Sequence, residues 1–191
     1  MKKFILLFSA VMTFSMCQAA QKIVTVNIEK LFNSYYKTSQ VENIIKKQAQ
    51  VYQDYLNKKL ESVKAIDKKF RVQLDKAQNV TISSADRSAA AKEAEKLSNE
   101  IRVIRKEMEV YSNEKRKEMG NMTMRKRQEL MQEITACVRK TAEGLGADFV
   151  FDVSGRTAHQ IPAVIYAKPS TDITNQVLQI LNKGNVPEKR K

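Results

Sequence analysis

The feature that most constrains the fold of this 191-residue chain is the absence of glycine and proline from its first 119 residues. All five glycines and all three prolines lie between residues 120 and 187. Because these two residue types interrupt regular structure most strongly, the middle of the chain is expected to be nearly continuous helix. The segment 144–187, which holds most of them, is expected to be a different kind of structure.

Apolar residues recur at helical spacing on both sides of a stretch of turn-forming residues at 79–83. Before it, from Tyr52 to Ala77, the steps are 4, 4, 3, 3, 4, 4 and 3 residues, which form one stripe along a helix. After it, steps of 4, 3, 4 and 3 residues predict a coiled-coil seam made by Leu97, Ile101, Ile104, Met108 and Tyr111.

Capping signals set the expected ends of the two helices. Thr38 or Ser39 is expected to cap the first helix, with Glu42 three residues after Ser39, and Ser83 with Asp86 has the same capping spacing. These signals predict helices starting near 39 and 84, and Gly144 and Gly146 are expected to end the second. At ~1.5 Å per residue they would be ~60 Å and ~90 Å long. Helices of that length cannot fold into a compact bundle, so an antiparallel hairpin projecting from a small body is expected.

The chain ends supply the body. Strands are predicted at 22–28, 147–153 and 163–167, one helical turn at 29–34, and a last helix at 172–181 capped by Ser170 or Thr171. The predicted fold class is mainly α with a small β part: a coiled-coil tentacle on a β-stranded oligomerisation body. Since so few elements bury little surface alone, the body is expected to need partner subunits.

The first twenty residues have the order of a secretory signal peptide: two lysines, a short apolar run and small residues at the end. A permanent membrane anchor and lipid attachment at Cys17 are the alternatives, but the run is short for a bilayer. The expected organisation is a signal peptide (1–20) cleaved near Ala19 or Ala20, the body with its first strand (21–38), the hairpin (39–143), the rest of the body (144–182) and a basic flexible tail (183–191).

The chain carries 34 lysines and arginines against 21 aspartates and glutamates, a net charge of +13. Both signs are mixed along the hairpin, so a solvated surface is the ordinary interpretation, and attraction to acidic polypeptide, anionic lipid or lipopolysaccharide is the functional one. Basic residues are densest near the tip and at 115–117 and 125–127. The candidate client or anionic-surface contacts are the group near the tip and three methionines around Gly120: Lys68, Lys69, Phe70, Arg71, Lys76, Arg87, Met119, Met122 and Met124.

One histidine and two cysteines leave little material for catalysis or metal binding. His159 is expected in an exposed loop, and Cys137 is expected to be a small buried hydrophobe. No P-loop or Rossmann glycine pattern is present, so no enzyme, cofactor or metal is expected. Nucleic acid is not expected as a partner either, because the basic clusters lack stacking aromatics and the signal peptide indicates export.

The order of these parts, with Gly144–Asp152 (GLGADFVFD) and the run Ala163–Asn182, resembles the Skp family of periplasmic chaperones, also called the OmpH family. The resemblance implies a homotrimer with three helical tentacles hanging from a β-body around a cavity. It also implies a periplasmic holdase that keeps unfolded outer-membrane proteins from aggregating, without ATP or cofactor. The alternative function is a secreted coiled-coil scaffold or adaptor that docks to one fixed folded partner.

Overall fold

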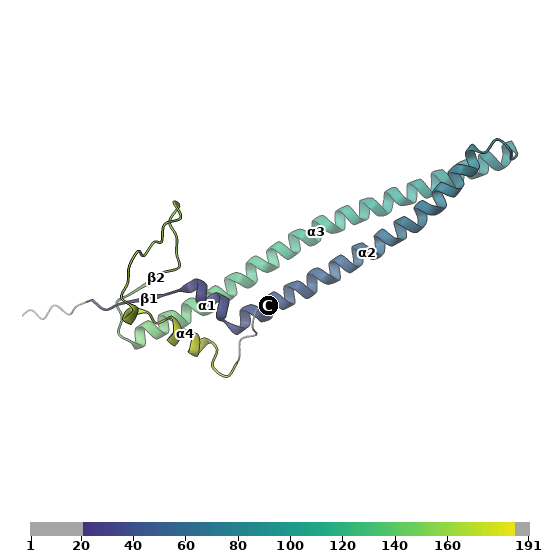
Figure 1. Ribbon diagram of the computed structural model, residues 1–191. Helices are drawn as coiled ribbons and strands as arrows, with labels where there is room; N and C mark the ends of the chain where they lie inside the picture. The colour runs from purple at the N-terminus through teal and green to yellow at the C-terminus, as the bar shows by residue number, and fades with distance from the viewer. Residues whose placement is uncertain (1–20, 186–191) are drawn as a thin grey trace, which may run out of the picture.

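The computed structural model describes residues 21–185, so the predicted signal peptide and most of the predicted tail lie outside the described residues. Two long helices lie side by side and project from a small body at one end (Figure 1). The predicted fold class is confirmed: the chain is mainly helical, with a long helix pair and a small sheet.

The hairpin consists of α2 (Tyr36–Gln78) and α3 (Ser84–Gly144). The cap predicted at Ser83 is confirmed, because its side chain accepts a hydrogen bond from the backbone N–H of Asp86 over 3.1 Å. The cap predicted at Thr38 or Ser39 is wrong: α2 begins at Tyr36, after an extended Tyr35 with no side-chain cap. Ser39 lies inside the first turn and donates its hydroxyl to the carbonyl of Tyr36 over 2.8 Å.

The end of α3 is fixed by a glycine in the left-handed region. Gly146 has φ of +65° and donates its N–H to Glu143 O over 2.9 Å, while Ala147 donates to Ala142 O over 3.0 Å. This pair of bonds is a Schellman motif, which satisfies carbonyls that the helix would otherwise leave open. The chain then turns directly into the second strand.

The sheet has two parallel strands, β1 (Ile23–Val26) and β2 (Phe149–Asp152), paired from Ile23 with Phe149 to Val26 with Asp152. Parallel neighbours require a crossover connection, and here the crossover is the whole helical hairpin. The sheet therefore joins the chain segment that leads into the hairpin to the segment that leaves it. On its other side, β1 bonds to the chain before the last helix, where Ile173 donates its N–H to Thr25 O over 2.9 Å.

The third predicted strand, 163–167, is wrong. This segment belongs to the long loop between β2 and the short 3-10 helix η1 (Pro169–Thr171), which stands out from the body in Figure 1. Its two arms meet at an isolated bridge between Arg156 and Pro162. Residues 163–167 are a short apolar run (AVIYA) that pairs with no strand in the described part of the chain, and Ile165 and Tyr166 are 86% and 79% exposed.

The core of the body lies where the foot of α3 meets α1 (Ile28–Ser34) and α4 (Thr174–Leu181). The last helix begins two residues later than predicted, because Pro169–Thr171 forms η1 and the side chain of Asp172 accepts from the N–H of Thr174 over 2.8 Å. Leu31, Ile134 and Val177 are fully buried, each stabilising the body by about 1.5–3 kcal/mol. The buried cluster consists of Val24, Val26, Leu31, Tyr35, Leu130, Ile134, Val138, Ala142, Ile173 and Val177.

Packing along the hairpin is uneven. Towards the tip, Val63 of α2 and Ala90, Ala94, Leu97 and Ile101 of α3 are buried. The other predicted seam residues, Ile104, Met108 and Tyr111, are only half-buried. From there to Leu130 every α3 side chain is half-buried or exposed. The middle of the hairpin therefore presents more of its apolar surface to solvent than either end.

Candidate functional site

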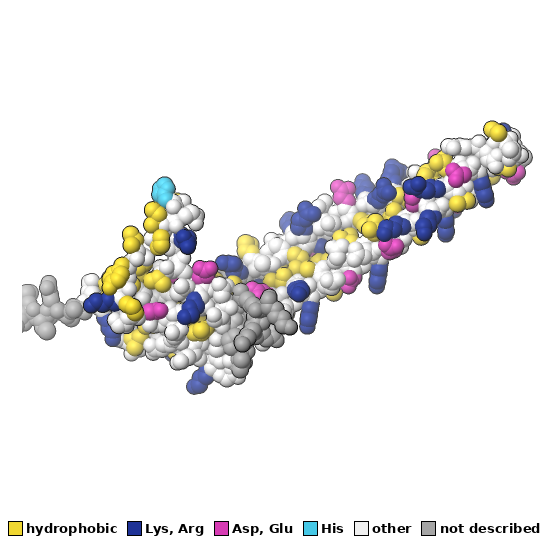
Figure 2. Space-filling view, in the orientation of Figure 1, with side chains coloured by type: hydrophobic (Ala, Val, Ile, Leu, Met, Phe, Trp, Pro, Cys, Tyr) yellow, Lys and Arg dark blue, Asp and Glu magenta, His cyan; other side chains and the backbone are white. Residues whose placement is uncertain are grey.

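The side chains with functional potential lie on surfaces of the body and the hairpin. Within residues 21–185, no group of three histidine, cysteine or acidic side chains could hold a metal ion. In the same range, no helix combines the length and hydrophobicity needed to cross a membrane. The single histidine, His159, is exposed in the loop that stands out from the body (Figure 2).

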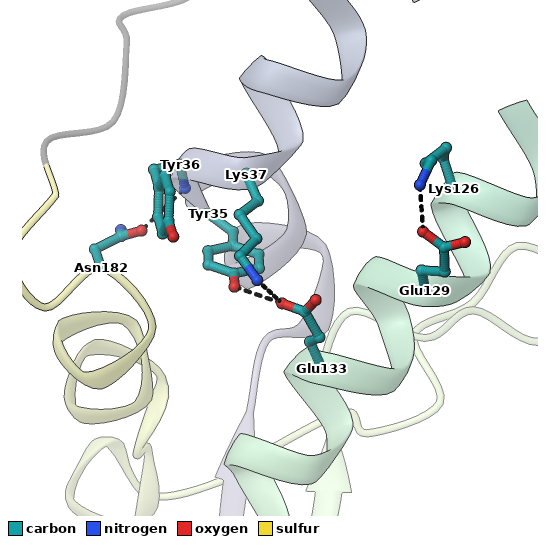
Figure 3. Close-up of polar contacts among 7 residues, drawn as sticks. All are labelled: Tyr35, Tyr36, Lys37, Lys126, Glu129, Glu133 and Asn182. Carbon is teal, nitrogen blue, oxygen red and sulfur yellow. Dashed lines mark hydrogen bonds and ion pairs between the residues drawn. The ribbon is translucent and has the colours of Figure 1, made fainter. Parts of the chain in front are cut away.

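Three residues at the foot of the hairpin, Tyr35, Lys37 and Glu133, form a hydrogen-bonded group that we call the base cluster (Figure 3). Tyr35 Oη and Lys37 Nζ both donate to Glu133 Oε2, each over 2.7 Å. Tyr35 is buried and is the one extended residue between α1 and α2, whereas Glu133 lies on α3. The base cluster therefore ties the start of α2 to α3.

The ionisation of the base cluster follows from these contacts. Hydrogen bonds from Lys37 and then Tyr35 favour the carboxylate and lower the pKa of Glu133. The hydrogen bond to Glu133 raises the pKa of Lys37. Burial, followed by the bond to Glu133, raises the pKa of Tyr35 to about 12. The group therefore holds one ion pair and one neutral phenol across the neutral pH range.

Asn182 closes the same end of the molecule from the other side (Figure 3). Its Oδ1 accepts from the backbone N–H of Tyr36 over 2.9 Å, and its Nδ2 donates to Ser34 O over 2.9 Å. These bonds bridge the break between α1 and α2. The direction in which the hairpin leaves the body is thus set by Asn182 and the base cluster together.

Halfway along the hairpin lie three tyrosines, Tyr52, Tyr55 and Tyr111, which we call the tyrosine cluster. The ring centroids of Tyr55 and Tyr111 are 4.2 Å apart, and those of Tyr52 and Tyr111 are 6.2 Å apart with the rings edge to face. Lys115 Nζ lies 5.0 Å from the Tyr52 centroid, a cation–π arrangement. Tyr111 was predicted as a simple seam residue, and its aromatic partners were not anticipated.

Ion pairs hold the surroundings of the tyrosine cluster in place. Lys115 contacts Glu118 over 2.6 Å, and Tyr52 Oη donates to the other oxygen of Glu118 over 2.9 Å. Lys59 of α2 reaches Glu107 of α3 over 3.2 Å. These hydrogen bonds raise the pKa of Lys59 and Lys115 and lower the pKa of Glu118.

The basic residues predicted near the tip do not form one positive patch. Lys68 and Lys69 line a shallow groove that also contains Glu93 and Glu100 of α3. Arg71 is turned towards Asp67, 2.9 Å away on its own helix. Lys76 lines a separate hollow at the loop with Ile82 and Asp86. Phe70 and Arg87 are half-buried, so the tip is a mixed-charge surface.

The second basic cluster is also partly engaged within the chain. Lys126 pairs with Glu129 over 2.7 Å (Figure 3), and the Arg127 guanidinium lies 4.9 Å from the centroid of the Phe32 ring. Of the three methionines around Gly120, Met119 and Met122 are half-buried and Met124 is 67% exposed. Cys137 is half-buried and unpaired, and burial raises the pKa of its thiol.

One face of the small sheet is apolar and open to solvent. Ile23, Phe149 and Phe151 lie on this face together with Thr25; the three apolar residues are exposed, whereas Thr25 is buried. The two phenylalanine rings stack with centroids 6.3 Å apart. Parallel strands are normally covered on both faces, so this face is a candidate interface.

Sequence reasoning missed the base cluster and most of the tyrosine cluster. The base cluster joins residues almost a hundred positions apart, and no local pattern marks them. The tyrosine cluster had a usable signal: Tyr52 and Tyr111 lie about equally far from the predicted turn at 79–83, so an antiparallel hairpin must bring them level.

Comparison with known proteins gives one family and one fold. The family model described as outer membrane protein (OmpH-like) matches residues 22–181. A crystal structure from Caulobacter crescentus CB15, described as an OmpH-like outer membrane chaperone, matches with a TM-score of 0.68. The match covers 91% of this chain and 90% of that chain at 14% identity, a likeness of fold. Among curated protein sequences, none matches this chain.

Proposed function

The chain belongs to the OmpH family of non-enzymatic, outer membrane chaperone-like proteins, and on that premise we propose that it is an ATP-independent periplasmic holdase for unfolded outer-membrane proteins. The observation that carries the proposal is the exposed two-helix surface of the hairpin. On it, lysines, arginines and acidic residues surround partly exposed apolar side chains (Figure 2). Such a surface suits many weak contacts with a chain that has no fixed shape.

The small free energy of each single contact favours loose holding of a client. An exposed ion pair contributes about 0.2–1 kcal/mol, and a partly exposed valine or tyrosine adds a comparable amount when covered. Several such contacts together retain a client, yet each can break and re-form as the client moves. Because salt screens exposed charges beyond ~8 Å at physiological ionic strength, the electrostatic part of holding is expected to weaken as salt is added.

The proposed working form is a homotrimer. A two-stranded sheet with one open apolar face is not self-sufficient, and Ile23, Phe149 and Phe151 together with Ile165 and Tyr166 leave apolar surface exposed on the body. We propose that neighbouring copies cover this surface and hold three hairpins around a common space. The number three rests on the family resemblance.

Export and surface contacts complete the proposal. Residues 1–20 are proposed to act as a signal peptide cleaved near Ala19 or Ala20, which would deliver the chain to the periplasm. The tip, where Lys68 and Lys69 lie beside Glu93 and Glu100, is proposed to touch acidic client segments or an anionic lipid or lipopolysaccharide surface. The mixed charge at this groove predicts that such contacts are weak.

The test compares one client in two states. A urea-unfolded outer-membrane β-barrel protein is diluted into buffer containing the mature chain, and the same protein folded in detergent micelles serves as the matched control. Co-elution of the unfolded but not the folded form in size-exclusion chromatography is expected. Binding to a single folded partner, with no capture of several different unfolded clients, would support the scaffold alternative instead.

A further inference from the structure

An apolar groove lies beside the tyrosine cluster, halfway along the hairpin. It has a volume of about 440 Å³, and Tyr55, Val103, Val110 and Tyr111 supply its apolar lining. Tyr55, Val103 and Val110 are 39%, 52% and 48% exposed, so part of each side chain is open to solvent even though Tyr55 packs on Tyr111 of α3. Glu107 and Glu114 line the groove together with Lys106, so both signs of charge are present.

Two further exposed residues extend this groove into a stripe. Val51 and Ile44 precede Tyr55 by four and eleven residues and are both exposed, and these spacings bring side chains to the same side of a helix. At the other end, the Lys59–Glu107 pair fixes the register of the helices, which places Val103 level with Val63. The stripe, defined as Ile44, Val51, Tyr55, Val103 and Val110, therefore covers about twenty residues of α2, or ~30 Å.

The tyrosine cluster makes this stripe suited to an aromatic ligand side chain. Tyr52 is engaged by Glu118 and Lys115. Tyr55 has Tyr111 4.2 Å away and Lys59 Nζ 5.8 Å from its ring centroid, and it is still 39% exposed. An additional ring packed on Tyr55 would extend an aromatic group that the protein has already ordered. Such aromatic pairs contribute beyond the area that they bury.

The length and chemistry of the stripe point to one occupant. A membrane-spanning β-strand has about 9–11 residues and at ~3.3 Å per residue is about 30–36 Å long when extended. Its side chains alternate between apolar and polar, with aromatic residues near both membrane interfaces. Laid along the stripe, its apolar side chains would meet Tyr55 and the valines, and its polar side chains would face solvent.

We propose that this stripe binds one extended segment of an unfolded client, about the length of a single transmembrane β-strand and with alternating apolar and aromatic side chains. The inference rests on the proposed holdase function and names the surface and the client feature that it recognises. The contact is made by side chains, so it selects the alternating pattern and not one sequence.

The probe is a fluorescent eleven-residue peptide that alternates tyrosine, leucine and valine with serine and threonine, compared with a peptide of the same composition whose apolar residues are grouped at one end. The full mature chain is tested with Val51→Ser and Val110→Ser combined. The matched control is Leu60→Ser, because Leu60 is also partly exposed but lies five residues after Tyr55, about 140° round α2.

The combined variant is expected to weaken binding of the alternating peptide about tenfold, since two valine side chains lose their covered surface. Leu60→Ser should change it less than about twofold, and the grouped peptide should bind the wild type more weakly than the alternating one. Circular dichroism should show unchanged helix content for both variants because all three positions are exposed. Equal binding by the combined variant and the wild type would overturn the proposal.

Two results separate this inference from the function on which it rests. If the wild type holds unfolded clients and the combined variant holds them equally well, the role of the stripe as a client-binding site is refuted while the holdase function stands. If the wild type fails to hold any unfolded client, the function itself is refuted. A change in oligomer size caused by the combined variant would overturn the stripe as a client site and assign it to contact between copies of this chain.

Discussion

At the scale of single residues, one carboxylate oxygen at the foot of the hairpin joins elements that are distant in sequence. Glu133 Oε2 accepts from both Tyr35 and Lys37, so losing it removes two contacts between α3 and the start of α2. The Lys37 and Glu133 side chains are 38% and 44% exposed. Solvent screening therefore limits their ion pair to less than ~1 kcal/mol. The pair nevertheless connects α2 to α3 at the end of the hairpin that joins the body.

The base cluster predicts the pH dependence of stability. The pKa of Glu133 is lowered below its ordinary value of 4.5, so its contribution is present above about pH 4.5 and is lost as the pH falls further. The pKa of Lys37 is raised above 10.5 and that of Tyr35 is raised from 10.0 to about 12, so their contributions are lost as the pH rises beyond about 10. Glu133→Gln should lower stability most between pH 5 and 9, with urea unfolding as the measurement.

Glu129→Gln is the matched control, one turn earlier on α3. Within residues 21–185, Glu129 pairs with Lys126 alone, three residues away on the same helix, and such local pairs contribute about 0.3–0.5 kcal/mol. The control should therefore cost less than Glu133→Gln at pH 7. Identical urea midpoints for the two variants would show that the base cluster adds nothing beyond an ordinary surface pair.

At the scale of elements, two glycines predict opposite effects of the same substitution. Gly120 lies within α3, and a Cβ added there meets no atom within 4 Å. Gly120→Ala should stabilise the chain by about 0.5–1 kcal/mol through helix propensity and reduced unfolded-state entropy. Gly146→Ala should destabilise it by about 1 kcal/mol or more, because φ is +65° there. Thermal unfolding followed by circular dichroism checks both, and a shared sign would contradict this assignment.

The helices were predictable because their signals are local. The missing glycines and prolines, the apolar spacing and the Ser83 cap all lie within a few turns of the residues they describe. The start of α2 was missed because Tyr35 and Asn182, not a local cap, determine it. The strand expected at 163–167 was wrong because a short apolar run does not show whether the fold brings a pairing strand beside it.

The candidate surfaces were less predictable than the helices. Composition identified basic residues near the tip, but only the packed hairpin places Glu93 and Glu100 beside Lys68 and Lys69. Composition placed three methionines around Gly120, but only the folded helix shows that Met124 is the exposed one. The stripe on the hairpin could be identified only once the register between α2 and α3 was known, and the Lys59–Glu107 pair supplies that register.

At the scale of the whole molecule, the open sheet face predicts how the assembly can be broken. Phe151→Asp places a charge on the apolar face next to Phe149 and should convert the proposed trimer into monomers, since an unpaired buried charge is costly. Ile180→Asp is the matched control, because Ile180 is similarly exposed, at 51% against 46% for Phe151, but lies on α4 and not in the sheet. Light scattering coupled to size-exclusion chromatography gives the masses, and a Phe151→Asp variant that keeps the wild-type mass would locate the interface elsewhere.

The length of the hairpin predicts that assembly of the oligomer and holding of the client depend on different parts of the chain. A chain in which residues 60–103 are replaced by its own turn, 79–83, keeps the body core and the base cluster but loses the tip and part of the stripe. It should keep the wild-type oligomer, measured by sedimentation velocity, and should hold clients markedly less well. Loss of the oligomer in this variant would show that the hairpin, and not the body, carries assembly.

The most direct test of the holdase proposal is light scattering of a urea-unfolded outer-membrane β-barrel protein diluted into buffer with and without the mature chain, at low and high salt. We expect aggregation to be suppressed near one oligomer per client, and suppression to be weaker at high salt because exposed charges are screened. No suppression at any ratio, by a chain that circular dichroism shows to be folded and helical, would contradict the account and favour a scaffold that docks to one folded partner.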